Sequence, residues 1–299
     1  MGAGPATSVL NKVMIEGLGI EALLSMQTAG HNAAHHAGVG QAALLGSRMA
    51  ALYRCWSGRT PVDLVALTAC LLRRHAGQDQ PLGLACLDVS TAVATWGGHA
   101  YHSAGHHAEV VTNTAVLVEL ASGLGCPLSP RHVLLLLVAA SAHDYRYAPG
   151  QAFKVRFAAE RVAAEAMDHV ARRRGVTPAD RADITMLILA TEPGSRRFLA
   201  SAPVEDAPEP LQPLMFRPDL VPLAAMLSDA DLLSSAGLTV RWHQVQRERL
   251  ERELGHPISP ADNAAFFDGV VGPGFLSGPG RHFTPNLVRI RAAAGLTAA

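Results

Sequence analysis

The chain has 299 residues, 49% of them hydrophobic and 17% charged, which is enough apolar material for a large hydrophobic core. This composition excludes a protein that is disordered over most of its length. The 25 Lys and Arg residues balance the 25 Asp and Glu residues, so no net charge draws the chain to nucleic acid or to an anionic membrane surface. The widely spaced cysteines predict buried, reduced thiols: Cys55, Cys70, Cys86 and Cys126.

The N-terminal segment lacks the pattern of a secretory signal, because Lys12, Glu16 and Glu21 interrupt its apolar residues. An uncharged apolar run at residues 133–142 is too short to cross a bilayer core of about 30 Å. We therefore expect a cytoplasmic protein with no membrane partner. Residues 1–85 show no recognisable chemistry and are expected to form helices packed on a domain of residues 86–299.

Helix-start signals recur along the chain as a Ser or Thr followed by Pro: Thr60-Pro61, Ser129-Pro130, Thr177-Pro178 and Ser259-Pro260. The hydroxyl can accept from an unpaired backbone N–H, and proline loses no hydrogen bond at the first helical position. Apolar runs of helical length follow at 61–72, 131–142 and 179–190. Residues 153–174 also show helical spacing, and Gly175 follows as a helix-ending signal.

Alternating strand patterns with hairpin turns are missing from the sequence, so it predicts an all-α fold. The stretch from Ser201 to Pro222 contains six prolines, counting Pro222, and is predicted to be one long irregular loop. Loops of that length are usually lids, binding loops or disordered segments.

The first chemically informative stretch is Tyr-His-x-x-x-His-His-Ala-Glu-Val, beginning at Tyr101 and leading into a helical run. Positions four apart share a helix face, so His102 and His106 are expected to line up. His107 is expected to point about 100° away, toward the surface or behind the site.

The second stretch is His143-Asp144, at the end of the apolar run 131–142. A buried Asp is costly unless it is paired or bound to a metal. Neighbouring helical positions diverge, so the imidazole is expected to bind one metal while the Asp144 carboxylate bridges to a second.

The third stretch is Ser-Asp-Ala-Asp-Leu-Leu, with Asp229 and Asp231 on a further helical run. Residues two apart on a helix point about 200° apart, so only one carboxylate can face a given metal. Asp231 is the preferred ligand, and Asp229 is the alternative.

His106, His143, Asp144 and Asp231 together supply two imidazoles and two carboxylates, which suit Zn²⁺, Mn²⁺ or Fe²⁺ in a first site. A neighbouring site of carboxylate and water suits Mg²⁺ or Mn²⁺. Two such ions roughly 3.5–4 Å apart can share a hydroxide and clamp a phosphoryl group. The pattern predicts hydrolysis of a small-molecule phosphoester.

The order His, His-Asp, Asp resembles the HD superfamily of metal-dependent phosphohydrolases, and the Tyr101 motif is similar to its cyclic-nucleotide phosphodiesterase branch. The likeness spans residues 96–283. It implies a helical HD domain, a bridging metal hydroxide as nucleophile, a nucleotide or cyclic nucleotide as substrate, and His102 as the acid that protonates the leaving oxygen. By the same resemblance Glu160 and Glu192 lie near the substrate pocket, and Phe275 stacks on the base.

The sequence departs from that branch at two places. A further histidine expected after His-Asp is missing from Tyr145-Arg146-Tyr147, and no glutamine precedes Phe275 where one should grip a purine. We therefore expect a phosphoester without specifying which one.

Several alternatives stay open at this stage. His102 could be a supporting or core histidine, and Glu160 an ordinary surface charge. His31, His35 and His36 also show metal-like spacing, although no carboxylate follows them. The chain could instead be a mixed-valent di-iron oxygenase, with His107 or His169 as a further ligand, or a metal-containing binding module without turnover.

Overall fold

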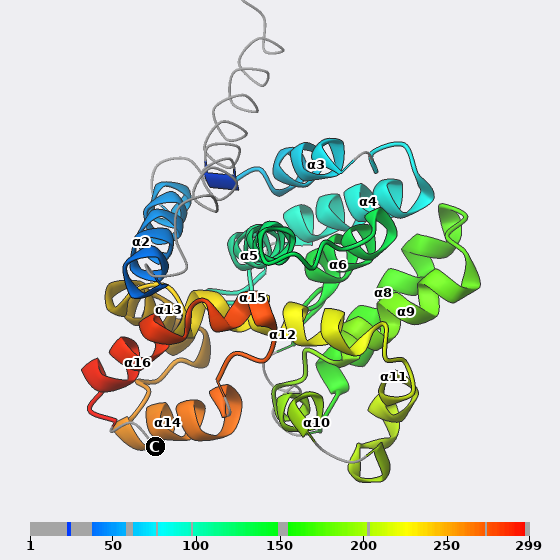
Figure 1. Ribbon diagram of the computed structural model, residues 1–299. Coiled ribbons are helices and arrows are strands. Elements are labelled where there is room, and N and C mark those ends of the chain that lie inside the picture. Colours follow the sequence, from blue (N-terminus) through cyan, green and yellow to red (C-terminus); the bar gives the residue numbers. More distant parts are fainter. Residues whose placement is uncertain are drawn as a thin grey trace, which may run out of the picture.

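The computed structural model describes residues 23–24, 38–57, 62–75, 77–96, 98–148, 155–201, 204–272 and 274–296. Within these ranges every regular element is a helix and no strand occurs, which confirms the all-α class (Figure 1). The longer helices are α2 (Gly38–Ser57), α3 (Leu64–Arg74), α4 (Pro81–Trp96), α5 (Ala104–Gly123), α6 (Pro130–Ala142), α8 (Ala158–Arg173), α9 (Pro178–Leu189), α12 (Val221–Ala236), α13 (Val240–Leu254) and α16 (Thr284–Ala293). The shorter elements are η2 (Pro193–Ser195), α10 (Arg196–Ser201), η3 (Val204–Asp206), η4 (Glu209–Leu211), α11 (Gln212–Met215), α14 (Pro260–Ala265), the π-helix η5 (Phe266–Val271) and α15 (Gly278–Arg281).

Helix α6 forms the centre of the core. All of its residues from Val133 to Ala142 are buried, and it packs against α4, α5, α9 and α12. Burying one leucine side chain contributes about 1.5–3 kcal/mol, and α6 has four in a row at 134–137. Helix α5 packs on α12 as well as on α6, so the three helices that carry the motif residues are in mutual contact.

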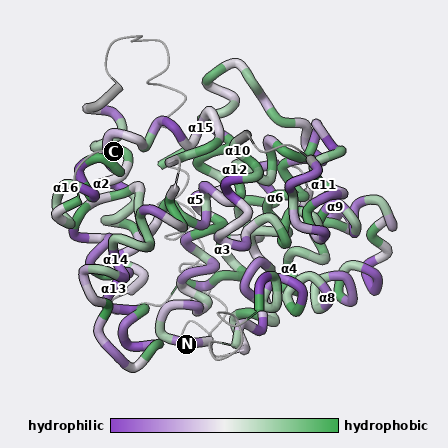
Figure 2. The backbone as a smooth tube through the Cα atoms, turned by 90° about the horizontal axis from the view of Figure 1, so that it is seen from below, coloured by the Kyte–Doolittle hydropathy of each residue, from purple (hydrophilic) through white to green (hydrophobic). Residues whose placement is uncertain are grey.

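The outer helices are amphipathic, whereas α6 is apolar on all sides. Figure 2 shows hydrophobic residues along α6 and many hydrophilic ones along α13. Only three residues of α13 are buried, namely Trp242, His243 and Gln246. Helix α13 therefore packs through polar contacts as well as through Trp242, because Gln246 and Arg249 each donate to the buried Glu109 at 2.6 Å.

Three of the predicted helix starts are confirmed. Ser129, Thr177 and Ser259 are the N-caps of α6, α9 and α14, and each side chain accepts from the backbone N–H three residues on. Helix α3 instead starts after Asp63, whose carboxylate accepts from Ala66 N at 3.0 Å. Thr60 and Pro61 lie outside the described residues.

Helix α8 begins later than the spacing predicted. It starts at Ala158, and Phe157 before it has φ 61°, a left-handed conformation that cannot continue a helix. Residue 153, the predicted start, lies outside the described residues.

The prediction of a wholly irregular loop at 201–222 is wrong for its described part. The short helices η3, η4 and α11 occupy much of it, and α12 starts at Val221. Pro occupies the first turn of η4, α11 and α12, because proline fits the start of a helix as well as a loop.

The N-terminal helices are packed on the rest of the chain. Helix α2 contacts α16 and α5, and α3 contacts α4 and α5. The segment boundary drawn between residues 85 and 86 falls inside α4. No single helix in the described ranges is long and apolar enough to cross a membrane; α12 and α13 reach that length only together, with a bend of 95° between them.

None of the four cysteines forms a disulfide bond, as predicted, but the prediction that they are buried holds only for Cys86. Cys70 is half-buried, and Cys55 and Cys126 are exposed because they lie on outward positions of α2 and on the segment after α5.

Candidate metal centre

The N-terminus of α5 places His106 in the first helical turn. Ser103 is the N-cap, and its hydroxyl accepts from the backbone N–H of His106 at 3.4 Å. His102 therefore precedes the helix and lies in the bend before it. The expectation that His102 and His106 share a helix face is wrong, because the cap ends the helical backbone between them.

His143 and Asp144 lie where α6 ends. Helix α6 ends at Ala142, and its C-cap His143 still has helical backbone angles (φ −51°, ψ −39°). Tyr145 N donates to the Ala142 carbonyl at 2.9 Å in the turn that follows. The two side chains converge instead of diverging, with His143 Nε2 and Asp144 Oδ2 only 3.1 Å apart. The expected divergence fails because the pair lies in a turn.

Helix α12 brings Asp231, and not Asp229, to the two histidines. Asp231 Oδ1 lies 3.2 Å from His106 Nε2 and 3.5 Å from His143 Nε2. Asp229 is fully buried on the other side of α12, where Arg196 Nη2 and the backbone N–H groups of Leu276 and Ser277 donate to it.

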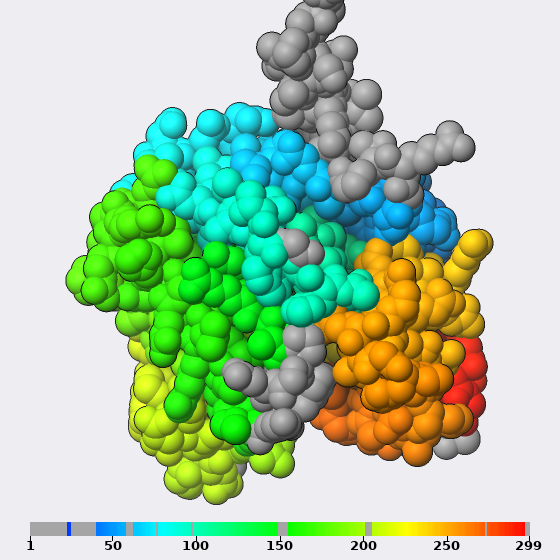
Figure 3. Space-filling model, turned by 180° about the vertical axis from the view of Figure 1, so that it is seen from behind, coloured from blue at the N-terminus to red at the C-terminus, as the bar shows by residue number. Residues whose placement is uncertain are grey.

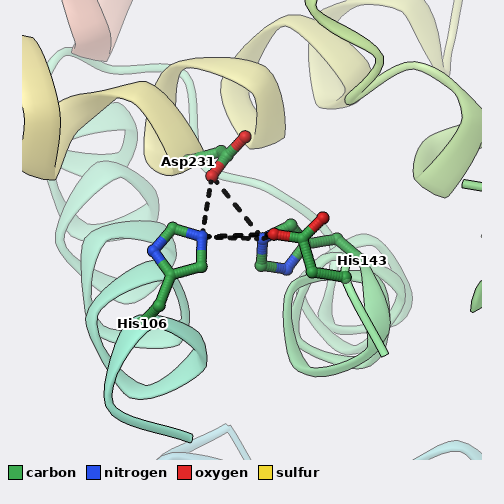
Figure 4. Close-up of side chains that lie close together, drawn as sticks. His106, His143 and Asp231 are labelled. Carbon is green, nitrogen blue, oxygen red and sulfur yellow. Dashed lines mark hydrogen bonds and ion pairs between the residues drawn. The ribbon is translucent and has the colours of Figure 1, made fainter. Parts of the chain in front are cut away.

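Figure 4 shows His106, His143 and Asp231 pointing toward one another from α5, the end of α6 and α12. One ligand atom from each of these residues and one from Asp144 all lie within 4.8 Å of one another. Contacts measured within this set range from 3.1 to 3.5 Å. Ligands of a tetrahedral zinc ion at about 2.0–2.1 Å are separated by about 3.4 Å, so the group could hold a metal ion.

The surroundings of the two imidazoles fit a metal. His143 Nδ1 donates to the Ala140 carbonyl at 2.9 Å, which leaves the Nε2 lone pair turned toward the group. The two Nε2 atoms approach to 3.2 Å, and two lone pairs so close need a proton or a cation between them. The histidine side chains are buried, whereas those of Asp231 and Asp144 are 30% and 14% exposed. Solvent can therefore reach the group from the side of the two carboxylates and not from the side of the histidines.

Without metal, the imidazoles and the carboxylates of the group stabilise each other's charged forms. Burial lowers the pKa of His106, but hydrogen bonds to Asp144 and Asp231 outweigh it and raise the pKa to about 9. The same carboxylates overcome burial at His143 and raise its pKa well above the ordinary value. Burial would raise the pKa values of Asp144 and Asp231, but the histidines hold both below the ordinary value.

His102 stands beside this group without joining it. Its Nε2 lies 3.8 Å from Asp144 Oδ2, and its Nδ1 lies 2.5 Å from Glu253 Oε1. The other oxygen of Glu253 accepts from the backbone N–H groups of Tyr101 and His102 at 2.8 and 3.0 Å. The ring of Tyr147 stacks on the His102 ring, with centroids 3.6 Å apart and an interplanar angle of 21°.

A cavity of about 490 Å³ adjoins His102. It lies where the segment before α5 meets α13 and α14; Figure 3 shows these cyan and orange segments side by side. Its walls include Tyr101, His243, Leu250, Asn263 and Phe266. His243 Nδ1 donates to the Ser235 carbonyl at 2.7 Å, so its Nε2 is left as an acceptor.

The residues predicted near the substrate have different surroundings. Glu160 is 9% exposed in the first turn of α8, and burial together with the charges of Asp144 and Glu192 raises its pKa to about 7. It is therefore not a surface charge. Glu192 is also buried, and Arg156 donates to both of its carboxylate oxygens, at 3.0 and 2.7 Å.

The expectation that Phe275 stacks on a base is wrong for this arrangement. Phe275 is 4% exposed, and its ring packs against Phe283 at 6.4 Å in the core. The phenylalanine that lines the cavity beside His102 is Phe266.

The remaining histidines do not extend the group. His107 is fully buried, which excludes the surface position, and neither of its ring nitrogens has a partner among the described residues. Neither His107 nor His169 belongs to the set of ligand atoms found in the described ranges. His31, His35 and His36 lie outside those ranges.

Sequence reasoning missed Glu253, Tyr147, Asn263 and Phe266. Glu253 looks like one more charge of α13, 151 residues after His102. Asn263 and Phe266 follow the Ser259–Asp262 capping box and continue into the π-helix η5. π-Helices are frequent at functional sites, but no sequence signal for one was recognised.

No family model matches the sequence, and no curated protein is significantly similar to it. The likeness to the HD superfamily therefore depends on the motifs quoted above. What the structure adds is the convergence of His106, His143, Asp144 and Asp231 into one group that could hold a metal ion.

Proposed function

We propose that the protein is a metal-dependent phosphohydrolase of the HD type, with His102 as general acid. The observation that carries the proposal is His102 itself, an imidazole 3.8 Å from a carboxylate of the metal group and fixed from behind by Glu253. A purely structural metal group would not require an oriented imidazole at its open side.

The four ligands would hold a first cation, of zinc, manganese or iron, and the carboxylate of Asp144 is the candidate to share a second, of magnesium or manganese. When bound, such ions lower the pKa of a coordinated water and stabilise charge on phosphoryl oxygens.

Glu253, His102 and Glu160 would have different roles in the reaction. Glu253 accepts a hydrogen bond from the Nδ1–H group of His102, which leaves the Nε2–H group facing the metal group. As the bond between phosphorus and the leaving oxygen breaks, the electron pair stays on that oxygen and the Nε2 proton of His102 passes to it. We expect Glu160, a buried carboxyl group whose pKa is raised in part by the charge of Asp144, to hydrogen-bond water at this side of the group.

The cavity beside His102 supports a nucleotide or cyclic nucleotide as substrate. A general acid must touch the leaving oxygen, so the leaving group extends from His102 into this cavity. Phe266 and Leu250 offer apolar contact, and Asn263 and His243 offer hydrogen bonds, which suits a nucleoside with a flat, polar-edged base.

The test uses protein loaded with Mn²⁺ or Zn²⁺ and a panel of aryl phosphoesters, nucleoside monophosphates and 3',5'-cyclic nucleotides. His102→Ala should lower kcat by about 10²–10⁴-fold while the metal content stays unchanged. His169→Ala, at an exposed histidine of α8, is the matched control and should behave as wild type. Turnover by His102→Ala at the wild-type rate would contradict the role of His102, and no turnover by the wild type would contradict the function.

A further inference from the structure

Tyr147 is connected to both sides of the site by its backbone. Its N–H donates to the Asp144 carbonyl at 3.0 Å, and its carbonyl accepts from His99 Nε2 at 3.1 Å. His99 N in turn donates to the His102 carbonyl at 2.9 Å. The turn that follows Asp144 and the segment that carries His102 are thus linked through Tyr147.

The His102 ring is fixed at one edge and on one face. Glu253 holds the Nδ1 edge, but a single hydrogen bond leaves the ring free to rock about the axis of that bond. The parallel ring of Tyr147, 3.6 Å away, removes this freedom because tilting would break the face contact. The other neighbouring rings, Tyr101 and His106, meet His102 edge-on at 71° and 81° and do not define its plane.

The phenol hydroxyl of Tyr147 does not explain its position. The side chain is buried, and its oxygen has no hydrogen-bond partner among the described residues. A buried hydroxyl without a partner is unfavourable, so the aromatic ring is the part of Tyr147 with a visible role.

We infer that Tyr147 is a positioning residue that holds the plane of the His102 imidazole and so aims its Nε2 proton at the leaving oxygen. The inference rests on the proposed function of His102. Tyr147 lies in the turn after His-Asp where the phosphodiesterase branch would have a further histidine. A fixed donor matters because proton transfer needs a heavy-atom approach of about 2.6–3.2 Å in good alignment.

The inference predicts an effect that depends on the leaving group. A leaving group of low pKa, such as p-nitrophenolate, departs without a proton, whereas phenolate or an alkoxide needs one. Tyr147→Leu should therefore lose about 10-fold or more in kcat on phenyl or alkyl esters and little on p-nitrophenyl esters. Tyr147→Phe keeps the ring and should match wild type on both.

Two controls separate positioning from general damage. Tyr145→Leu changes a tyrosine of the same turn whose ring meets Trp96 and not His102, and it should behave as wild type. In a His102→Ala background, Tyr147→Leu should cause no further loss, because a residue that acts only through His102 has nothing left to position.

The stack itself can be observed without turnover. In the wild-type proton NMR spectrum the His102 ring signals, identified by comparison with His102→Gln, should be shifted upfield by the Tyr147 ring. The shift should persist in Tyr147→Phe and disappear in Tyr147→Leu. This readout remains usable if a variant loses metal.

The outcomes are distinguishable. An equal loss on both kinds of ester, a loss in Tyr147→Phe as large as in Tyr147→Leu, or His102 signals that do not respond to Tyr147→Leu would overturn the inference alone. Absence of turnover by the metal-loaded wild type would overturn the proposed function, and the role of Tyr147 in it.

Discussion

Two carboxylates on α12, Asp229 and Asp231, lie two residues apart and have opposite surroundings. Asp229 is fully buried and accepts from Arg196, Ser277 and the backbone of Leu276. Asp231 contacts His106 and His143, and its side chain is 30% exposed. A carboxylate saturated by donors of its own chain is structural, whereas one that faces imidazole nitrogens and solvent is available to a metal.

Of the substitutions compared here, replacing Asp229 should destabilise the fold most. Asp229→Ala leaves the buried Arg196 guanidinium without its counter-charge and should cost about 3–5 kcal/mol of unfolding free energy. Urea unfolding of the metal-free protein measures this. If stability were unchanged, the structural role of Asp229 would be wrong.

Asp231→Ala should have the opposite profile. Removing a residue that only supports a metal ligand weakens metal binding by up to about 100-fold. Removing Asp231, a direct ligand, should therefore weaken metal binding by more than about 100-fold. The metal-free variant should lose less stability than Asp229→Ala, because Asp144 still faces His106 and His143 and because an imidazolium, unlike a guanidinium, can release its proton. Competition with a chelating dye measures the affinity, and wild-type affinity would indicate that Asp231 is not a ligand.

A pair of glycines sharpens the contrast. A Cβ on Gly280 would lie 2.2 Å from Asp229 Oδ2, whereas a Cβ on Gly278 would meet nothing within 4 Å. Gly280→Ala should therefore cost about 1–3 kcal/mol by crowding the Asp229 network. Gly278→Ala should stay within about 0.5 kcal/mol of wild type, and equal effects in the two variants would contradict the close approach.

The folding stability contributed by the group around Asp231 should depend on pH in the metal-free protein. The pKa of His106 is raised from 6.5 to about 9, so the folded state holds this proton more tightly than the unfolded state. The resulting stability is complete below pH 6.5 and is lost as the pH rises through 9, by about 1.4 kcal/mol per pH unit at most for this one group.

A bound metal ion should replace the proton on His106 and so remove this pH dependence of stability. Metal uptake at pH 7 should also release protons, which calorimetry in two buffers of different ionisation enthalpy detects. If uptake released no proton, the charge state assigned to His106 would be wrong.

The sequence predicted what local rules determine. Caps such as Ser129 and Ser259, the apolar run of α6 and the missing strand patterns were sufficient for the all-α class. The 200° separation on α12 limited the third ligand to Asp231 or Asp229, and the structure turns Asp231 toward the histidines.

Contacts between distant segments could not be predicted in the same way. Glu253 reaches His102 across 151 residues. Phe266, at the start of the π-helix η5, lines the cavity, whereas Phe275 lies outside that helix and is buried in the core. Helix periodicity also failed at His102 and at Asp144, since both lie just outside a helix end.

We expect four side chains, those of His106, His143, Asp144 and Asp231, to bind one metal ion. Crystals of the protein grown with Zn²⁺ or Mn²⁺ and measured at the absorption edge of that metal test it most directly. The anomalous map should show a peak about 2.0–2.2 Å from one atom of each of these four side chains. A map with no peak between them, or with the peak at Asp229, would contradict it.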